Sequence, residues 1–513
     1  MLRFLFVLGW AWAAVAAHAQ VLRVAVPELP ATLDPHSAAT PIERALAREI
    51  FEGLVTIDAF GRPAPGLAER WTIESGGTRY LFKLRPGVNW SDGRRITAED
   101  VVEGLKRALD PATRAPLSAL LLPIRSAAEF QLGTVTAGTP LGVVARSETE
   151  VEITLSAPSV RVLQVLSSPL AAPVPRHKMA QLGEAWAAPF LAVTNGAYAP
   201  TPMGDRYALK RNDRYRGEVA ASADRIEFAV VSSHDAAVEA VANDRADLAM
   251  GFAPEPAFSP APQLRAEAGL LTFNWIVNAA RPPFDRRDVR HALAMALDRE
   301  GFLAEAKLDG ATAAFSLTPQ AAIEGYDPPV APYGKLEPAD RIAIAEVLLL
   351  DVDRTKPLPI VLAIPEGRLH QSLAASAASA WRELGFTTQI DVRAAADHTR
   401  AVLEGAFDVA LGLEIDRDAD PWAAMLPFSR AAGALNVARY GELEFDERLI
   451  PADLETNPEY RLGNLRGAED VLAEDQVVWP LFVFTPSTPV SPRISGWQPN
   501  STGLHSLRFM SIK

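Results

Sequence analysis

Apolar and polar residues follow two different periods along this chain, and the two periods alternate from one end to the other. Residues 79–85 alternate between apolar and polar positions, which predicts a strand with one buried face. Residues 43–54 instead repeat apolar positions every four residues, which predicts an amphipathic helix. Because strand-like and helix-like segments continue to alternate, the pattern favours an α/β fold class.

The remaining elements are predicted from runs of apolar residues and from the turn residues that end them. The predicted strands are residues 21–26, 148–156, 225–231, 247–250, 273–278, 358–364, 388–392, 407–413 and 477–484. The predicted helices are residues 97–109, 233–243, 287–297, 339–350, 366–384 and 458–473, with another that ends at 400–404. A chain of 513 residues is too long for one ordinary core, so we expect two or three domains.

Composition and charge narrow the class of protein. Apolar residues make up 49% of the chain and charged residues 22%, which is typical of a globular protein. The formal net charge is −13, and no basic run is long enough to form a surface for a polyanion. We therefore expect no nucleic-acid partner.

Residues 1–19 have the pattern of a secretory signal peptide. Arg3 precedes an apolar run over residues 4–17, and Ala17-His18-Ala19 has the small-x-small form of a cleavage site. The apolar run is short for a membrane span. We therefore expect the mature chain to begin at Gln20 and to be exported.

The absence of certain side chains excludes several kinds of chemistry. Without cysteine, the chain forms no disulfide and carries no lipid-modified cysteine, so we expect a soluble periplasmic protein and not a lipoprotein. The eight histidines are dispersed without the spacing of metal ligands. No Gly-x-Ser-x-Gly elbow and no phosphate-binding loop is present. The sequence thus predicts no metal site, no cofactor and no enzymatic activity.

One stretch places charged residues where open α/β proteins hold their ligands. Residues 407–413 are predicted as a buried strand, and a helix begins after Asp420, its predicted N-cap. Between them lie Asp416, Arg417 and Asp418. Because ligands of such folds bind at the carboxyl ends of strands, this loop is either part of a binding site or a solvated acidic turn.

Short motifs in a fixed order support the first alternative. They are Leu33-Asp-Pro-His36, Ile50-Phe-Glu-Gly-Leu54, Leu67-Ala-Glu-Arg-Trp71, Phe82-Lys-Leu-Arg85, Trp90-Ser-Asp-Gly93, Thr97-Ala-Glu-Asp-Val101, Thr194-Asn-Gly-Ala-Tyr198, Pro283-Phe284, Asp288-Val-Arg290 and Ala296-Leu-Asp-Arg299. With these motifs the chain resembles the peptide/nickel class of ABC-importer solute-binding proteins (extracellular solute-binding proteins, family 5), above all the oligopeptide-binding branch. The resemblance covers nearly the whole mature chain.

The resemblance implies a type II periplasmic-binding-protein fold of cluster C, with two lobes, a hinge and an extra domain. The first lobe would comprise residues 20–51, 177–279 and 488–513. The extra domain would be residues 52–176, and the second lobe residues 280–487. The ligand would lie between the lobes, and hinge closure would bury it and create the form that docks on the permease.

The same resemblance singles out the loop before Asp420. In oligopeptide-binding relatives this loop carries a tryptophan and then an aspartate that receives the α-ammonium group of the peptide. Here Glu414 stands at the tryptophan position and Arg417 at the aspartate position. Three alternatives remain open: Asp416 or Asp418 takes over the ammonium, Arg417 selects a ligand carboxylate or phosphate, or Arg417 pairs only with its flanking acids.

Ligand contacts are also implied at both ends of the cleft. Ala39, Thr40 and Pro41 match the loop that pairs with the peptide backbone in relatives, although Pro41 has no N–H to donate. Trp422, directly after the Asp420 loop, is a further candidate contact. Residues 410–412, where relatives carry an arginine that contacts peptide termini, hold no cation.

Five further candidates lie in the predicted second lobe or on the strand that enters it. Lys307 and His370 match positions that approach the C-terminal end of the peptide, but each is equally consistent with a structural place, a surface lysine and a helix-start residue. Asn274, Trp275 and Asn278 lie on the strand that enters the second lobe, and Trp275 either lines the pocket or belongs to the core.

These observations predict a monomeric periplasmic protein that captures a peptide or peptide-like ligand and delivers it to an ABC permease and its ATPase. The altered anchor loop favours an unusual ligand, such as an N-blocked, anionic or cell-wall-derived peptide. Two alternatives remain: a binding protein for a non-peptide anion or metal chelate, and a sensor or partner protein that is independent of transport.

Overall fold

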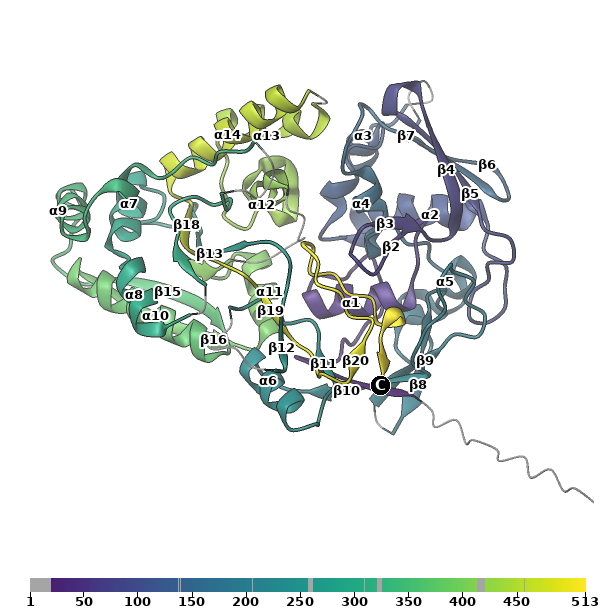
Figure 1. Cartoon of the computed structure of the whole chain (residues 1–513). Helices are drawn as coiled ribbons and strands as arrows, with labels where there is room; N and C mark the ends of the chain where they lie inside the picture. Colours follow the sequence, from purple (N-terminus) through teal and green to yellow (C-terminus); the bar gives the residue numbers. More distant parts are fainter. Residues whose placement is uncertain are drawn as a thin grey trace, which may run out of the picture.

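The computed structural model describes residues 20–136, 138, 140–204, 206–256, 262–308, 310–320, 325–412, 420–455 and 457–513. The predicted signal peptide and the loop 413–419, with Glu414, Asp416, Arg417 and Asp418, lie outside these residues. The described chain is mixed α/β, with two larger β-sheets and a smaller one in separate parts of the molecule (Figure 1). No helix among the described residues is both long enough and apolar enough to cross a membrane.

The first lobe is built on a five-stranded sheet. Its order is β11 (Leu248–Ala249), β1 (Val21–Val26), β10 (Arg225–Val230), β9 (Arg206–Arg211) and β8 (Tyr198–Met203). β1 lies between β10 and β11 and is parallel to both, so Leu22, Val24 and Val26 are fully buried. Helices α1 (Pro41–Ile50) and α6 (His234–Ala242) belong to this lobe.

The second lobe is built on a six-stranded mixed sheet. Its order is β14 (Thr312–Ala313), β18 (Val478–Phe484), β13 (Leu271–Val277), β17 (Val409–Leu411), β15 (Leu358–Pro365) and β16 (Phe386–Arg393). Helices with it are α7 (Arg287–Ala296), α8 (Arg299–Ala306), α9 (Pro338–Leu348), α10 (Arg368–Glu383), α11 (Ala395–Glu404), α12 (Pro421–Met425), α13 (Leu443–Leu454) and α14 (Pro458–Asp475). Its core includes the buried edge-to-face pair Trp381 and Trp479, with ring centroids 5.8 Å apart.

The extra domain holds a four-stranded antiparallel sheet beside helix α2 (Ala98–Leu109). The strand order is β4 (Ala68–Glu74), β5 (Arg79–Leu84), β7 (Glu150–Thr154) and β6 (Val143–Ser147). Tyr80, Phe82 and Leu84 are the buried face of β5, as the alternation predicted. Helix α2 begins with a capping box, in which the Asp100 carboxylate accepts a hydrogen bond from the Thr97 backbone N–H.

The chain passes between the two lobes at residues 267–270 and 485–486. Just on the first-lobe side, β12 (Leu264–Ala266) pairs with β19 (Ser487–Pro489). The Glu267 backbone N–H donates to the Pro486 carbonyl, so the two crossing segments are bonded to each other. The predicted boundary at 279/280 is therefore too late: β13 pairs with β17 and β18 of the second sheet, because its apolar residues complete that core.

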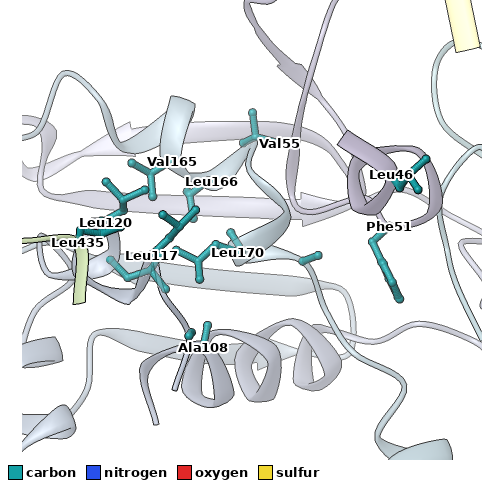
Figure 2. Packing of buried hydrophobic residues seen from close by; sticks show 14 of the residues in the cluster. Leu46, Phe51, Val55, Ala108, Leu117, Leu120, Val165, Leu166, Leu170 and Leu435 are labelled. Atoms are coloured by element: carbon teal, nitrogen blue, oxygen red, sulfur yellow. The ribbon is translucent and has the colours of Figure 1, made fainter. Parts of the chain in front are cut away.

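The extra domain also contacts the second lobe directly. Figure 2 shows Leu435 of the second lobe beside Leu117 and Leu120 of the extra domain, and all three are buried in one apolar cluster. Nearby, the Arg161 guanidinium lies 4.4 Å from the ring centroid of Trp422. The two lobes and the extra domain therefore enclose a common space.

Candidate ligand-binding site

A cavity of about 220 Å³ lies where the three parts of the molecule meet. The first lobe contributes the start of α1 and the loop after β11, and the second lobe contributes α11 and the end of β17. Leu117 and Leu120 of the extra domain close a further side. Walls from both lobes mean that an occupant touches both and stabilises the arrangement in which they are close together.

The start of α1 forms one edge of the cavity, with Ala39, Thr40 and Pro41 in its lining. The Glu43 carboxylate accepts hydrogen bonds from the backbone N–H groups of Ala39 and Thr40, at 2.9 and 2.8 Å. The Ala39 carbonyl accepts a hydrogen bond from the Arg44 guanidinium at 2.5 Å. These backbone groups already have partners within the chain, so the edge is ordered before any ligand pairs with it.

The charged groups in the described lining are of one sign. Arg44 and Arg48 project from α1 and both line the cavity, whereas no Asp or Glu is among the described lining residues. Much of the remaining wall is apolar, including Leu248, Leu403 and Leu411. In its described part, the cavity therefore combines apolar surface with two guanidinium groups, a combination that suits an amphipathic ligand with an acidic group.

A buried cluster of ionisable groups lies behind the cavity wall, between the lobes. Glu255 of the first lobe is 3.2 Å from His370 on α10 and 3.7 Å from His234 on α6. Burial raises the pKa of Glu255 to about 8 and lowers the pKa of His370 to about 4. The pair is thus a neutral one at pH 7, with the proton on the carboxyl group.

Three histidines that the sequence analysis left unassigned line the cavity: His234, His398 and His505. His234 stands at the first position of α6, and His398 lies on α11 of the opposite lobe. Both side chains are more than nine-tenths buried. The sequence analysis considered these histidines only for the spacing of metal ligands, and nothing local in the sequence indicates that residues so far apart line one cavity.

Several predicted contacts have structural places away from the described cavity lining. Trp275 is completely buried in the core of the second lobe, and Asn278 is also buried, its amide donating to the Gly405 carbonyl. Lys307 is exposed and ends α8 in a left-handed conformation. Trp275 and Lys307 thus have the structural places that were left open for them, and Asn278 lies outside the described cavity lining.

The remaining described candidates also have partners within the protein. Asp420 caps α12, as predicted, and pairs with Arg461 at 2.5 Å, and it is not among the described lining residues. Trp422 donates its indole N–H to the Leu449 carbonyl and is likewise a packing residue. His370 contacts Glu255 and is absent from the lining. Asn274 is not among the lining residues, but its backbone carbonyl accepts a hydrogen bond from the N–H of Gly412, which is.

Comparison with known proteins places the chain in a family. The family profile described as bacterial extracellular solute-binding proteins, family 5 Middle, matches residues 62–436. The chain is similar to the probable deoxycholate-binding periplasmic protein YgiS of Escherichia coli K12, with 29% identity over 464 residues, or 88% of this chain and 86% of that protein. It is also similar to the periplasmic oligopeptide-binding protein OppA of Salmonella typhimurium LT2, with 29% identity over 479 residues, or 91% and 87% of the two chains.

The fold and the lobe arrangement can be compared with one solved protein in two forms. The murein tripeptide binding protein MppA of Escherichia coli superposes with a TM-score of 0.87 at 24% identity, covering 97% of this chain and 99% of that one. The unliganded open form of MppA superposes with a TM-score of only 0.62 at 25% identity, covering 97% of this chain and 98% of that one. The lobes of this chain are therefore arranged differently from those of the open form. The fold is that of the type II periplasmic binding proteins, and the chain belongs to the bacterial extracellular solute-binding proteins of family 5.

Proposed function

We propose that this protein captures a peptide or peptide-like ligand in the cavity between its lobes and delivers it to an ABC import permease and its ATPase. The observation that carries the proposal is the cavity itself, whose walls come from both lobes and the extra domain. A ligand there stabilises the closed arrangement, and the closed arrangement is a surface that a permease can distinguish from the open one. The names of its relatives OppA and MppA support a peptide as the ligand class.

The same proposal places the protein in the periplasm as a monomer that acts by binding and not by catalysis. Residues 1–19 have the form of a signal peptide, and the absence of cysteine leaves no site for lipid attachment. No group of three or more possible metal ligands occurs within the described ranges. The protein needs no cofactor for this role, because closure is driven by contacts with the ligand.

A second candidate ligand is an amphipathic anion. The apolar lining with Arg44 and Arg48, and without any described carboxylate, favours it. The relative YgiS carries the name of a deoxycholate-binding protein, and deoxycholate has an apolar body and one carboxylate. A peptide with a free carboxyl terminus also carries an acidic group, so the two candidates differ chiefly in whether the ligand has backbone amides.

Native mass spectrometry of protein purified from its own periplasm tests the proposal. Short peptides released from the protein support peptide transport, and a single anionic amphiphile supports the second candidate. An empty protein whose melting temperature does not rise with tri- to penta-alanine or with deoxycholate contradicts both, and favours a sensor or partner role.

The anchor loop is tested by exchanging the charge at residue 417. If the ammonium of a peptide lies near this residue, Arg417→Asp binds free-amine peptides more tightly than the wild type does. Arg417→Met is the matched control, since it removes the cation without adding an anion. Equal peptide affinity in all three proteins shows that residue 417 lies outside the site.

A further inference from the structure

His398 lines the cavity and carries a buried ring nitrogen without a hydrogen-bond partner. Its side chain lies on α11, is 3% exposed and is part of the cavity lining. Its Nε2 is 3.2 Å from the Leu411 carbonyl oxygen, which can only accept a hydrogen bond. Nε2 therefore carries the hydrogen. His398 Nδ1 has no hydrogen-bond partner among the described residues.

The ring is neutral, which fixes the role of Nδ1. Burial lowers the pKa of His398 to about 4, with the nearby His370 and Arg393 acting in the same direction and Asp391 against it. In a neutral imidazole only one nitrogen carries a hydrogen, so with Nε2 as donor, Nδ1 is an acceptor. A buried acceptor without a donor is unfavourable, and such groups in folded proteins normally find a partner.

A second histidine with an unpaired ring nitrogen lies on the opposite wall of the cavity. His234 Nε2 of the first lobe is also buried without a described hydrogen-bond partner, and His234 lines the same cavity. Each lobe thus contributes to the cavity lining one histidine with an unpaired ring nitrogen. An occupant that satisfies both nitrogens joins the lobes by hydrogen bonds as well as by apolar contact.

We propose that His398 Nδ1 accepts a hydrogen bond from an uncharged N–H or O–H group of the ligand, and that this contact selects ligands with a donor, such as a backbone amide, at that point. The inference rests on the proposed function and specifies its ligand chemistry. A carboxylate oxygen is disfavoured at the same place, because its lone pairs would face the lone pair of Nδ1. His398 is thus a specificity-determining residue that separates the donor-bearing part of a ligand from its acidic part.

The substitution His398→Gln separates this role from a structural one. A glutamine amide reaches the position of Nε2 and keeps the bond to Leu411, but it leaves nothing at the position of Nδ1. The matched control is His291→Gln on α7, because His291 Nε2 also donates to a carbonyl, that of Glu474 at 2.6 Å, and lies outside the cavity lining. Both variants are expected to unfold at nearly the wild-type temperature.

Binding is measured by calorimetry at pH 7 with the tightest binder among tri-, tetra- and penta-alanine, and with analogues of it methylated at one amide nitrogen each. We expect His398→Gln to bind the parent peptide about three- to tenfold more weakly than the wild type, the range of one net hydrogen bond. One methylated analogue should bind the wild type about three- to tenfold more weakly than the parent peptide does. The same analogue should bind His398→Gln as tightly as the parent peptide does. The His291→Gln control should bind every peptide as the wild type does.

Two negative results can be told apart, one that contradicts this inference alone and one that also contradicts the proposed function. If His398→Gln binds the parent peptide as tightly as the wild type, or if its loss is not coupled to any single amide, the inference is overturned while peptide binding stands. If the wild type binds none of the peptides, the proposed peptide function fails, and this inference fails with it.

Discussion

Glu255 Oε1 of the first lobe lies 3.2 Å from His370 Nε2 of the second, and this contact is almost fully buried. His370 Nδ1 is 3.3 Å from the Glu366 carbonyl, so Nδ1 donates and Nε2 is left to accept. With the pKa of Glu255 raised to about 8 by burial, the carboxyl group keeps its proton at pH 7. The lobes thus meet at a neutral carboxyl–imidazole contact, which avoids the cost of burying two charges.

This contact predicts a dependence of stability on pH. Between pH 4.5 and about 8 the folded protein holds a proton on Glu255 that the unfolded chain has released, so the free energy of unfolding falls as pH rises through this range. Glu255→Gln mimics the protonated carboxyl group and cannot ionise. We expect the variant to match the wild type at pH 5 and to be the more stable protein at pH 8.5, measured by denaturant unfolding.

Other titrating groups affect both proteins alike in this comparison. The groups that face Glu255 are His234, His370, Asp235 and Arg368, and the two histidines have lowered pKa values because of burial. Their protonation destabilises the fold only as pH falls below 6.5. A stability difference between wild type and variant that stays constant from pH 5 to 8.5 would contradict a protonated Glu255.

Leu435 is expected to contribute to closure more than to the stability of any one domain. It is 1% exposed and packs against Leu117 and Leu120 of the extra domain (Figure 2). Leu435→Ala removes apolar contact and leaves a cavity, at a cost of about 2–5 kcal/mol. Because part of this contact joins the extra domain to the second lobe, part of the cost should appear as weaker ligand binding.

The control for this prediction is Leu105→Ala, within the extra domain alone. Leu105 is fully buried on α2, so its truncation should lower the melting temperature to a similar extent while ligand affinity stays near the wild-type value. Equal losses of affinity in the two variants would show that Leu435 has no special role in closure.

Arg400 makes an ionic contact between the lobes that should matter only at low salt. Its guanidinium is 2.9 Å from the Glu28 carboxylate, but the arginine side chain is 42% exposed. Solvent screening limits such a pair to about 0.2–1 kcal/mol. Arg400→Gln is therefore expected to weaken ligand binding at most about fivefold at low ionic strength, and hardly at all in 0.5 M salt.

Arg62 supplies the matched control for Arg400. It pairs with Asp58 on the surface, within one part of the molecule, so Arg62→Gln should leave affinity unchanged at every salt concentration. A loss of affinity in Arg400→Gln that persists in high salt points to lost packing of the arginine side chain and not to its charge.

Gly196 packs against the end of α1, next to the point where the chain leaves the first lobe for the extra domain. Its N–H and that of Asn195 both donate to the Ile50 carbonyl at the end of α1. A Cβ at residue 196 would lie 2.5 Å from the Glu49 carbonyl oxygen and from the Ile50 carbonyl carbon. Both are backbone atoms that cannot move aside freely, so we expect Gly196→Ala to lower the free energy of unfolding by more than about 2 kcal/mol.

At Gly463 the same substitution is expected to have the opposite effect on the free energy of unfolding. It lies within α14, and a Cβ there meets nothing within 4 Å. Gly463→Ala should raise the free energy of unfolding by about 0.5–1 kcal/mol, through the greater helix propensity of alanine. Thermal unfolding of both variants tests the pair, and similar changes in the two would contradict the close approach at Gly196.

The local sequence patterns predict most of the elements but not all of their ends. The helix predicted for residues 43–54 begins at Pro41, where Thr40 and Glu43 form a capping box, and it ends at Ile50 because Phe51 is extended. Periodicity did not reveal α13, whose first turn carries Glu444 and Asp446 and whose interior contains Pro451. The pattern reports which face is buried, whereas the end of a helix depends on one or two backbone angles.

The candidate site was less predictable than the fold. The resemblance placed Ala39, Thr40 and Pro41 at the cleft edge, and they line the cavity. Trp275 and Asn278 were candidates because they lie on the strand that enters the second lobe, but both are buried outside the described cavity lining. The opposite placing of His234 and His398 depends on how two separate lobes close on each other, and residue spacing carries no information about that.

The paired crossing segments have a mechanical consequence. Because β12 and β19 are bonded to each other, and Glu267 is bonded to Pro486 where the chain leaves this ribbon, neither connection can twist independently of the other. The lobes then have essentially one degree of freedom, a rotation about an axis through the ribbon, and they cannot slide past each other. A longer or bulkier occupant changes the angle at which the rotation stops, and the separation of His398 and His234 changes with that angle. Occupants of different lengths would therefore meet the same polar groups at different separations, along one path of closure.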